Sequence, residues 1–115
     1  MRIMGFSKHW TKLDQAIFTT FRLTRKDKDW AVGEEVQIVL HPRSKDREVL
    51  KIAVITQIEL RSFYEYSCCQ ISNAEAKNDG FENAADMRMW MEHTHGHHAA
   101  TMSFHKITLR ELIKP

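Results

Sequence analysis

The run from Glu48 to Leu60 constrains the fold of this 115-residue chain more than any other segment. Its apolar side chains recur with a period of two, interrupted only at Thr56, and we expect one face to carry Leu50, Ile52, Val54, Ile58 and Leu60. This alternation predicts a β-strand. Because so long a strand normally bends, as strands do when a sheet closes into a barrel, the segment predicts a curled sheet.

Two shorter strands are predicted before this one. Between Phe18 and Leu23, Phe18, Thr20 and Arg22 alternate with Thr19, Phe21 and Leu23, and most of these residues favour strands. A second strand runs from Val36 to Leu40, after a turn in which Gly33 is free to take a positive φ. The segment from Lys12 to Ile17 is expected to form a helical turn or a loop, and His41 to Arg47 forms the connection to the long strand.

The final third of the chain predicts two helices and a closing strand. Ser72 and Glu75 have capping-box spacing, and Asp79-Gly80 ends that short helix. Asn83 caps a second helix, whose Met and Trp90 stripe is typical of a buried face. The closing strand is expected from Thr101 to Leu109, with a bulge near His105 because its apolar residues change phase there. The segment from Phe63 to Ile71 is ambiguous and fits a short strand.

Strands followed by helices and one last strand predict the α+β class. We expect a small, mostly antiparallel β-barrel with a helical insertion before the last strand. The length fits one domain spanning residues 1–115. Without a bilayer-length apolar run or a signal peptide, a cytoplasmic protein with no membrane partner is expected. The adjacent Cys68 and Cys69 predict reduced thiols packed in or near the core rather than a disulfide.

Positive charge is concentrated in the first half of the chain. Through Arg61 there are twelve Lys and Arg against eight Asp and Glu, a net +4, and the remainder carries five against seven, a net −2, which together give the +2 of the whole chain. This bias permits an anionic ligand but is weaker than a duplex-DNA-binding protein usually shows.

Arg22 is the leading candidate for contact with such a ligand. It ends a strand, and its guanidinium offers a rigid fork of donors that matches a phosphate or a base edge. A structural salt bridge to Glu75 or Asp79 is the alternative. Close by, Arg25 and Lys26 belong to a basic run that suits either a phosphate-binding patch or a solvated loop. Thr20 either donates a hydrogen bond into the same site or serves only the strand.

Two tryptophans and a group of histidines add further candidates. Trp30 suits either a stacking surface for an unstacked base or a barrel plug beside Gly33, and Trp10 leaves the same choice open. The histidines, namely His93, His95, His97 and His98, lie at the predicted end of a helix, where the helix dipole favours them in any case. Without a Cys, Asp or Glu inside the group, we predict no metal site and no cofactor.

The order of these elements resembles the ASCH domain of the PUA-like β-barrel superfamily. The matching residues are the strand Phe18 to Arg22, which ends on the signature arginine, and the turn Trp30 to Val36 into the next strand. The long strand, the helical pair and the closing strand follow in the family's order, so the resemblance spans about Lys12 to Leu109. It implies a barrel with a cleft between sheet and helices that binds RNA or a nucleotide-like ligand, with Arg22, Lys26, Thr20, Arg25 and Trp30 as ligand-binding residues.

One branch of this family resembles small amidohydrolases that act on acylated cytidines with a lysine, a threonine and a glutamate. Thr20 matches the threonine, but Ile17 stands at the position of the lysine, and the glutamate falls near Glu75 or on Lys77. Without a base, a threonine hydroxyl is a weak nucleophile. We therefore predict a binding protein without catalytic residues. The alternatives are a nucleoside hydrolase or ribonuclease using Lys12, His9 or Glu75 as the base, and a domain that binds a protein partner.

Overall fold

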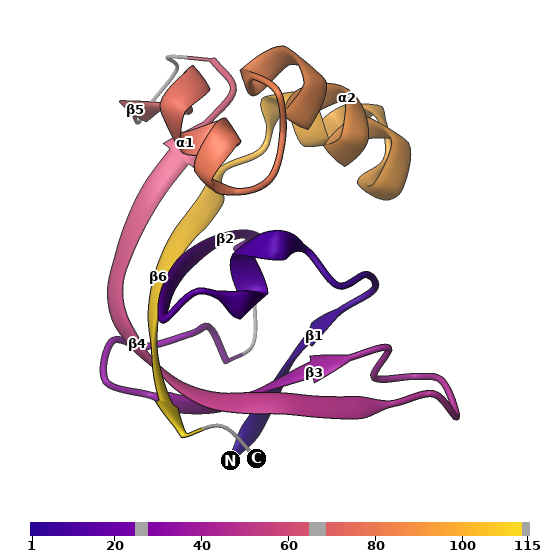
Figure 1. Cartoon of the computed structure of the whole chain (residues 1–115). Coiled ribbons are helices and arrows are strands. Elements are labelled where there is room, and N and C mark those ends of the chain that lie inside the picture. The colour runs from indigo at the N-terminus through magenta and orange to yellow at the C-terminus, as the bar shows by residue number, and fades with distance from the viewer. Residues whose placement is uncertain (25–27, 65–68, 114–115) are drawn as a thin grey trace.

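The computed structural model describes residues 1–24, 28–64 and 69–113, and these form a curled sheet covered at one end by helices (Figure 1). The strands and helices are β1 (Arg2–Phe6), η1 (Thr11–Asp14), β2 (Ile17–Leu23), β3 (Glu35–Leu40), β4 (Glu48–Ser62), β5 (Cys69–Gln70), α1 (Asn73–Asn78), α2 (Ala84–His95), η2 (His97–Thr101) and β6 (Phe104–Ile113). This confirms the predicted α+β class and the helical insertion before the last strand.

The six-stranded sheet is mixed but mostly antiparallel. Its order is β1-β3-β4-β6-β2, with β5 added to the end of β4. Strands β3, β4, β6 and β2 pair antiparallel, whereas β1 pairs parallel with β3 and β5 pairs parallel with β4. The sheet curls into a half-barrel, so its edge strands β1 and β2 approach each other below the helices (Figure 1). None of the described helices is long and apolar enough to cross a membrane.

Two apolar clusters occupy opposite faces of the sheet. The first fills the half-barrel and includes Phe18, Ile107 and Leu109. The second lies beneath the helices and includes Phe21, Met87, Met91 and Phe104 among others. Strand β2 contributes to both clusters because its alternate side chains point to opposite faces. The predicted alternation in β2 and the buried methionine face of α2 are confirmed.

The phase change in β6 has a different cause from the one predicted. Residues Phe104 to Ile107 pair in regular register with both β2 and β4, so the expected bulge near His105 is wrong. Phe104 belongs to the cluster under the helices, whereas Ile107 belongs to the half-barrel cluster. Strand β6 runs from the cluster under the helices to the half-barrel cluster. Its apolar side chains therefore lie on one face of the sheet at Phe104 and on the opposite face from Ile107 onward.

The predicted face of β4 is wrong in the middle of the strand. The buried side chains there are Lys51, Ala53 and Ile55, which alternate with the residues expected to share one face, whereas Leu50 and Ile58 of the predicted face do pack against the half-barrel core. The register shifts opposite β3 at Leu50 and opposite β6 at Thr56. Each shift adds one residue to β4, and an extra residue moves the alternation to the other face of the sheet.

The burial of two side chains differs from what the sequence predicts: Lys51 is buried and Cys69 is exposed. Lys51 is 2% exposed, and its Nζ donates to the Gln15 carbonyl over 2.8 Å and lies 4.8 Å from the centre of the Phe18 ring. Its aliphatic stem therefore packs inside the half-barrel while its charge meets polar atoms at the rim. Cys69 is exposed on β5, so the expectation of core packing fails for it, and Cys68 lies outside the described residues.

The connections before β3 and α1 have the predicted local geometry. Gly33 has a φ of 89°, and Arg2 on β1 binds the neighbouring Glu34 through two hydrogen bonds of 2.6 and 2.7 Å. Ser72 and Glu75 form a reciprocal capping box at the start of α1. These contacts fix the turn into β3 and the first helix.

Candidate functional site

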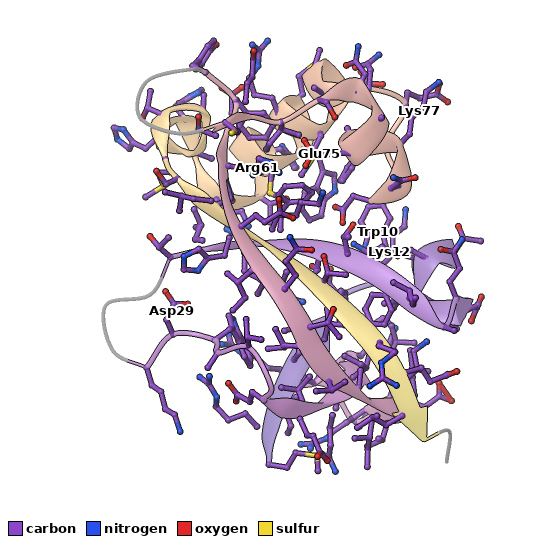
Figure 2. The ribbon with its side chains drawn as sticks, turned by 90° about the vertical axis from the view of Figure 1, so that its left-hand side faces the viewer. Trp10, Lys12, Asp29, Arg61, Glu75 and Lys77 are labelled. Carbon is purple, nitrogen blue, oxygen red and sulfur yellow. The ribbon has the colours of Figure 1, made fainter. Side chains whose placement is uncertain are left out.

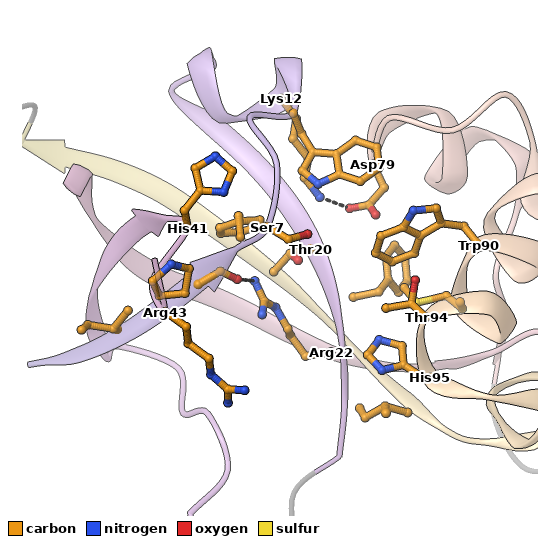
Figure 3. A pocket seen from close by; sticks show the side chains of 18 of the residues that line it. Ser7, Lys12, Thr20, Arg22, His41, Arg43, Asp79, Trp90, Thr94 and His95 are labelled. Atoms are coloured by element: carbon orange, nitrogen blue, oxygen red, sulfur yellow. Dashed lines mark hydrogen bonds and ion pairs between the residues drawn. The ribbon is translucent and has the colours of Figure 1, made fainter. Parts of the chain in front are cut away.

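A cavity of about 740 Å³ opens between the half-barrel and the helical layer (Figure 3). Its wall combines residues from β1, η1, β2 and the turn after β3 with residues from the end of α1 and from α2. The two apolar clusters meet here, since Phe6 belongs to the first and Met91 to the second. Its volume is within the range of sites that enclose small organic ligands.

Arg22 lies in this cavity wall and forms no salt bridge with Glu75 or Asp79, the two partners considered for it. Its Nη2 donates to the Gly5 carbonyl on β1 over 2.8 Å, and its guanidinium carbon lies 4.6 Å from the centre of the Phe6 ring. The Nε atom is buried and has no hydrogen-bond partner among the described residues. Burial lowers the pKa of Arg22 to about 10, although the nearby Asp79 favours its charged form. The group stays cationic at neutral pH, and its buried Nε donor is unused among the described residues.

Lys12 and Asp79 form an ion pair at the inner end of the cavity. The Lys12 Nζ lies 2.5 Å from the Asp79 Oδ1, and the two residues are only 6% and 4% exposed. Burial lowers the pKa of the Lys12 amine and raises the pKa of the Asp79 carboxyl to about 6, while their mutual attraction opposes both shifts. Figure 3 shows the pair close to Thr20 and Trp90.

An aromatic wall faces these charged groups. Trp10, Phe81 and Trp90 are half-buried, and the three rings pack with centroid distances of 5.2 to 5.7 Å. Gly80, which has a φ of 108°, lets the backbone approach Trp10 closely, since a Cβ at this position would lie 2.9 Å from a carbon of the indole ring. The wall is therefore held rigidly beside the Lys12–Asp79 pair.

The predicted site residues are brought together only in part. Arg22 and Thr20 both line the cavity, and so does Trp10. Trp30 does not line it: the ring packs against the half-barrel core, with the Arg2 guanidinium 4.2 Å from its centre. Lys26 and Arg25 lie outside the described residues.

Glu75 and His9, two of the proposed bases, do not line the cavity. Glu75 accepts from Arg61 over 3.0 Å and pairs with Lys106 over 2.8 Å, joining α1 to β4 and β6 (Figure 2). Although burial would raise the pKa of Glu75, hydrogen bonds from Lys106, the Ser72 amide and Arg61 lower it to about 2. His9 contacts Asp14 at the surface. Lys77 lies on the exposed side of α1 (Figure 2).

Of the four clustered histidines, His95 alone lines the cavity, beside Thr94 at the end of α2. His93 lies on the same helix, and His97 and His98 begin η2. Within residues 1–24, 28–64 and 69–113, no three His, Cys, Asp or Glu side chains gather closely enough to hold a metal ion.

Sequence reasoning missed the ion pair, Trp90 as a cavity residue and the turn that carries Arg43. Lys12 and Asp79 stand 67 residues apart, and no local pattern connects them. The signal that was present is chemical: a lysine close to Trp10 and Leu13 at the start of a predicted turn, and an aspartate at the end of a predicted helix.

No protein-family model matches the chain, and no curated protein or solved structure is significantly similar to it.

Proposed function

We propose that the cavity binds single-stranded RNA or a nucleotide-like anionic ligand. The observation that carries this proposal is Arg22, whose side chain lines a cavity large enough for a nucleoside and whose buried Nε–H has no partner in the described residues. A buried donor without a partner costs about 1–3 kcal/mol. A phosphate or carbonyl oxygen of a ligand would supply the missing acceptor.

The remaining walls suit the other parts of a nucleotide. Trp10 and Trp90 present half-buried aromatic surfaces, and stacking of a base on such a ring is worth roughly 1–3 kcal/mol. The charged side chains of the wall are Lys12, Arg22 and Arg43 against the single carboxylate of Asp79. This excess of positive charge favours an anion.

The resemblance to the ASCH domain leads to the same proposal. The curled, mixed half-barrel with helices between β5 and β6 is compatible with a PUA-like domain. Arg22, the matched signature arginine, lies in the cavity between sheet and helices. We therefore propose membership of that superfamily together with the ligand class that it implies.

Replacement of Arg22 tests the binding function. We expect Arg22→Gln to weaken binding of a short mixed-sequence single-stranded RNA by about 10- to 100-fold, since a hydrogen bond to a charged group contributes roughly 1.5–3 kcal/mol. Fluorescence anisotropy across a salt titration measures the affinity, and wild-type affinity should fall as salt rises. Arg110→Gln, an exposed arginine on β6, is the matched control and should bind like wild type. Equal affinities of the wild type and the Arg22 variant would reject the proposal.

Lys12 favours a second candidate, hydrolysis of an acylated nucleoside. It lines the same cavity as Thr20, so this wall carries both an amine and a hydroxyl although Ile17 replaces the lysine of the family pattern. Because burial lowers its pKa, Lys12 is more easily deprotonated than an exposed lysine and suits a base. It would accept the Thr20 hydroxyl proton as the oxygen attacks the acyl carbonyl, and Arg22 Nε–H would stabilise the oxyanion. The acyl group passes to Thr20, the nucleoside leaves with the proton, and water then releases the acid.

Turnover of N4-acetylcytidine tests this second candidate. If the enzyme hypothesis holds, chromatography will detect cytidine and acetate with the wild type, and Thr20→Val and Lys12→Met will each lower kcat by at least about 100-fold, the scale of acid–base catalysis. Glu75→Gln is the control outside the cavity and should retain turnover. Activity that survives Thr20→Val would exclude Thr20 as the nucleophile, and no wild-type turnover would leave binding as the function.

A further inference from the structure

The turn from His41 to Ser44, which links β3 to β4, is held in an unusual conformation at the mouth of the cavity. His41 has a φ of 50°, and it is the only non-glycine with a positive φ among residues 1–24, 28–64 and 69–113. Its amide donates to the Phe6 carbonyl over 2.8 Å, and its carbonyl accepts from the Ser44 amide over 3.0 Å. Such backbone conformations are uncommon and often occur at functional sites.

Gly5 on β1 holds this turn close to the sheet. A Cβ at Gly5 would lie 2.6 Å from the Pro42 Cγ, so a larger residue would displace the proline. Pro42 therefore packs directly on the backbone of β1, and the same Gly5 contributes the carbonyl that accepts from Arg22. One glycine thus connects the buried arginine to the turn at the mouth.

Arg43 projects from this fixed turn and has no carboxylate partner among the described residues. It borders the cavity with Ser44 and Ser7, while His95 lies on the opposite side of the mouth (Figure 3). At the inner end Asp79 balances Lys12, whereas at the mouth Arg43 meets no carboxylate from the described part of the chain and lies among the hydroxyl groups of Ser44 and Ser7. Arginine and hydroxyl groups are the usual protein ligands of phosphate.

We propose that the turn His41–Ser44 binds the phosphate of a nucleotide whose base lies inside the cavity. The inference rests on the proposed binding function and deepens it: the ligand enters base first, with its base near Arg22 and Trp90 and its phosphate against Arg43. The ligand class is then a phosphorylated nucleoside, either a free mononucleotide or a residue within an RNA strand.

The test compares nucleosides with their phosphates. Isothermal titration measures the affinity of each of the four ribonucleosides and of its 5′- and 3′-monophosphates for the wild type. We expect at least one monophosphate to bind about 10-fold or more tightly than its parent nucleoside, as a charge-assisted contact implies. Arg43→Gln should remove this preference. Arg47→Gln, an exposed arginine in the same connection that does not line the cavity, should retain it.

A second variant separates the fixed turn from general positive charge. Gly5→Ala leaves every charge in place but displaces Pro42, so it should also reduce the phosphate preference. A phosphate preference that persists in Arg43→Gln rejects the phosphate site and leaves the binding function standing. The same holds if nucleoside and nucleotide bind the wild type equally and Arg22→Gln abolishes the binding of both. If neither nucleosides, nucleotides nor RNA bind the wild type, the proposed function itself fails.

Binding of dinucleotides distinguishes the two sources of phosphate. A 5′-phosphorylated mononucleotide that binds as tightly as a dinucleotide indicates a free nucleotide ligand. A dinucleotide that binds the wild type more tightly than the mononucleotide does, but binds Arg43→Gln no more tightly than the mononucleotide, indicates that the ligand is a residue within an RNA strand. Either result supports the phosphate site. A dinucleotide whose affinity equals that of the nucleoside in the wild type overturns it.

Discussion

Asp79→Ala is expected to lower the free energy of unfolding by about 3–5 kcal/mol, the usual cost of removing one member of a buried ion pair. The substitution leaves the Lys12 ammonium buried without its partner 2.5 Å away. Chemical denaturation at pH 7 measures the loss. The double variant Lys12→Met/Asp79→Leu should recover most of it, because apolar residues of similar volume often replace a buried pair without loss of stability. A loss below about 1 kcal/mol in Asp79→Ala would show that the pair is solvated.

The pH dependence of this effect has a defined sign. The pKa of Asp79 is about 6 in the folded protein, against a reference value of 3.8. Between these values the folded state binds a proton that the unfolded state does not, so the contribution of Asp79 to stability rises as pH falls through 6 and declines as pH rises. Asp79→Asn lacks this term. The free energy of unfolding of Asp79→Asn should lie below that of the wild type by an amount that becomes smaller as pH rises from 4.5 to 7.5.

The other titrating groups of the cavity do not obscure this comparison. Asp79→Asn changes only this carboxyl, and every other side chain of the cavity wall is common to both proteins. Lys12 acts in the same direction. Burial lowers the pKa of Lys12, and in Asp79→Asn no carboxylate charge opposes this shift. A lysine with a lowered pKa in the folded state contributes more stability as pH rises, so the variant approaches the wild type. A deficit that widens with rising pH would contradict the burial of the pair.

Gly80→Ala is expected to destabilise the protein by two additive effects. Its φ of 108° strains any residue with a Cβ, which costs about 1–3 kcal/mol. The new Cβ would also lie 2.9 Å from the Trp10 ring, and forced overpacking costs a further ~1–3 kcal/mol. Thermal and chemical denaturation measure the sum, and ligand affinity should fall with it because Trp10 lines the cavity.

Gly33→Ala is the matched control for this prediction. Gly33 also has a positive φ, 89°, but no atom lies within 4 Å of a Cβ built there. The difference between the two glycine variants therefore isolates the contact with Trp10. Equal losses of stability would show that the indole moves away without cost, and the aromatic wall would then be less rigid than its packing indicates.

The sequence predicted well the features that depend on near neighbours. The alternation in β2, the capping box at Ser72 and the positive φ at Gly33 follow from interactions within a few residues, and all three are present. The helical insertion before the last strand was also predicted. Strand β1 was not, because it pairs parallel with β3 at the edge of the sheet and has little alternation of its own.

The sequence pointed to Arg22 and Thr20 in the cavity wall but not to the Lys12–Asp79 ion pair beside them. Arg22 and Thr20 follow from one strand pattern, and both line the cavity because the C-terminal half of β2 runs along its wall. Trp30 was a reasonable aromatic candidate by position, but its ring is held by Arg2 on another strand. The choice between Trp10 and Trp30 depends on which strands the sheet brings together.

By itself the sequence determined the class of fold, the position of the helical insertion before the last strand and the arginine near the end of β2, because local periodicity and capping act over a few residues. The tertiary structure alone decided that Lys51 lies inside and that Lys12 meets Asp79. Burial of a lysine depends on two register shifts in β4, and the ion pair depends on a helix folding back over the half-barrel after 67 residues. Such contacts depend on the packing of whole elements, which no local pattern specifies.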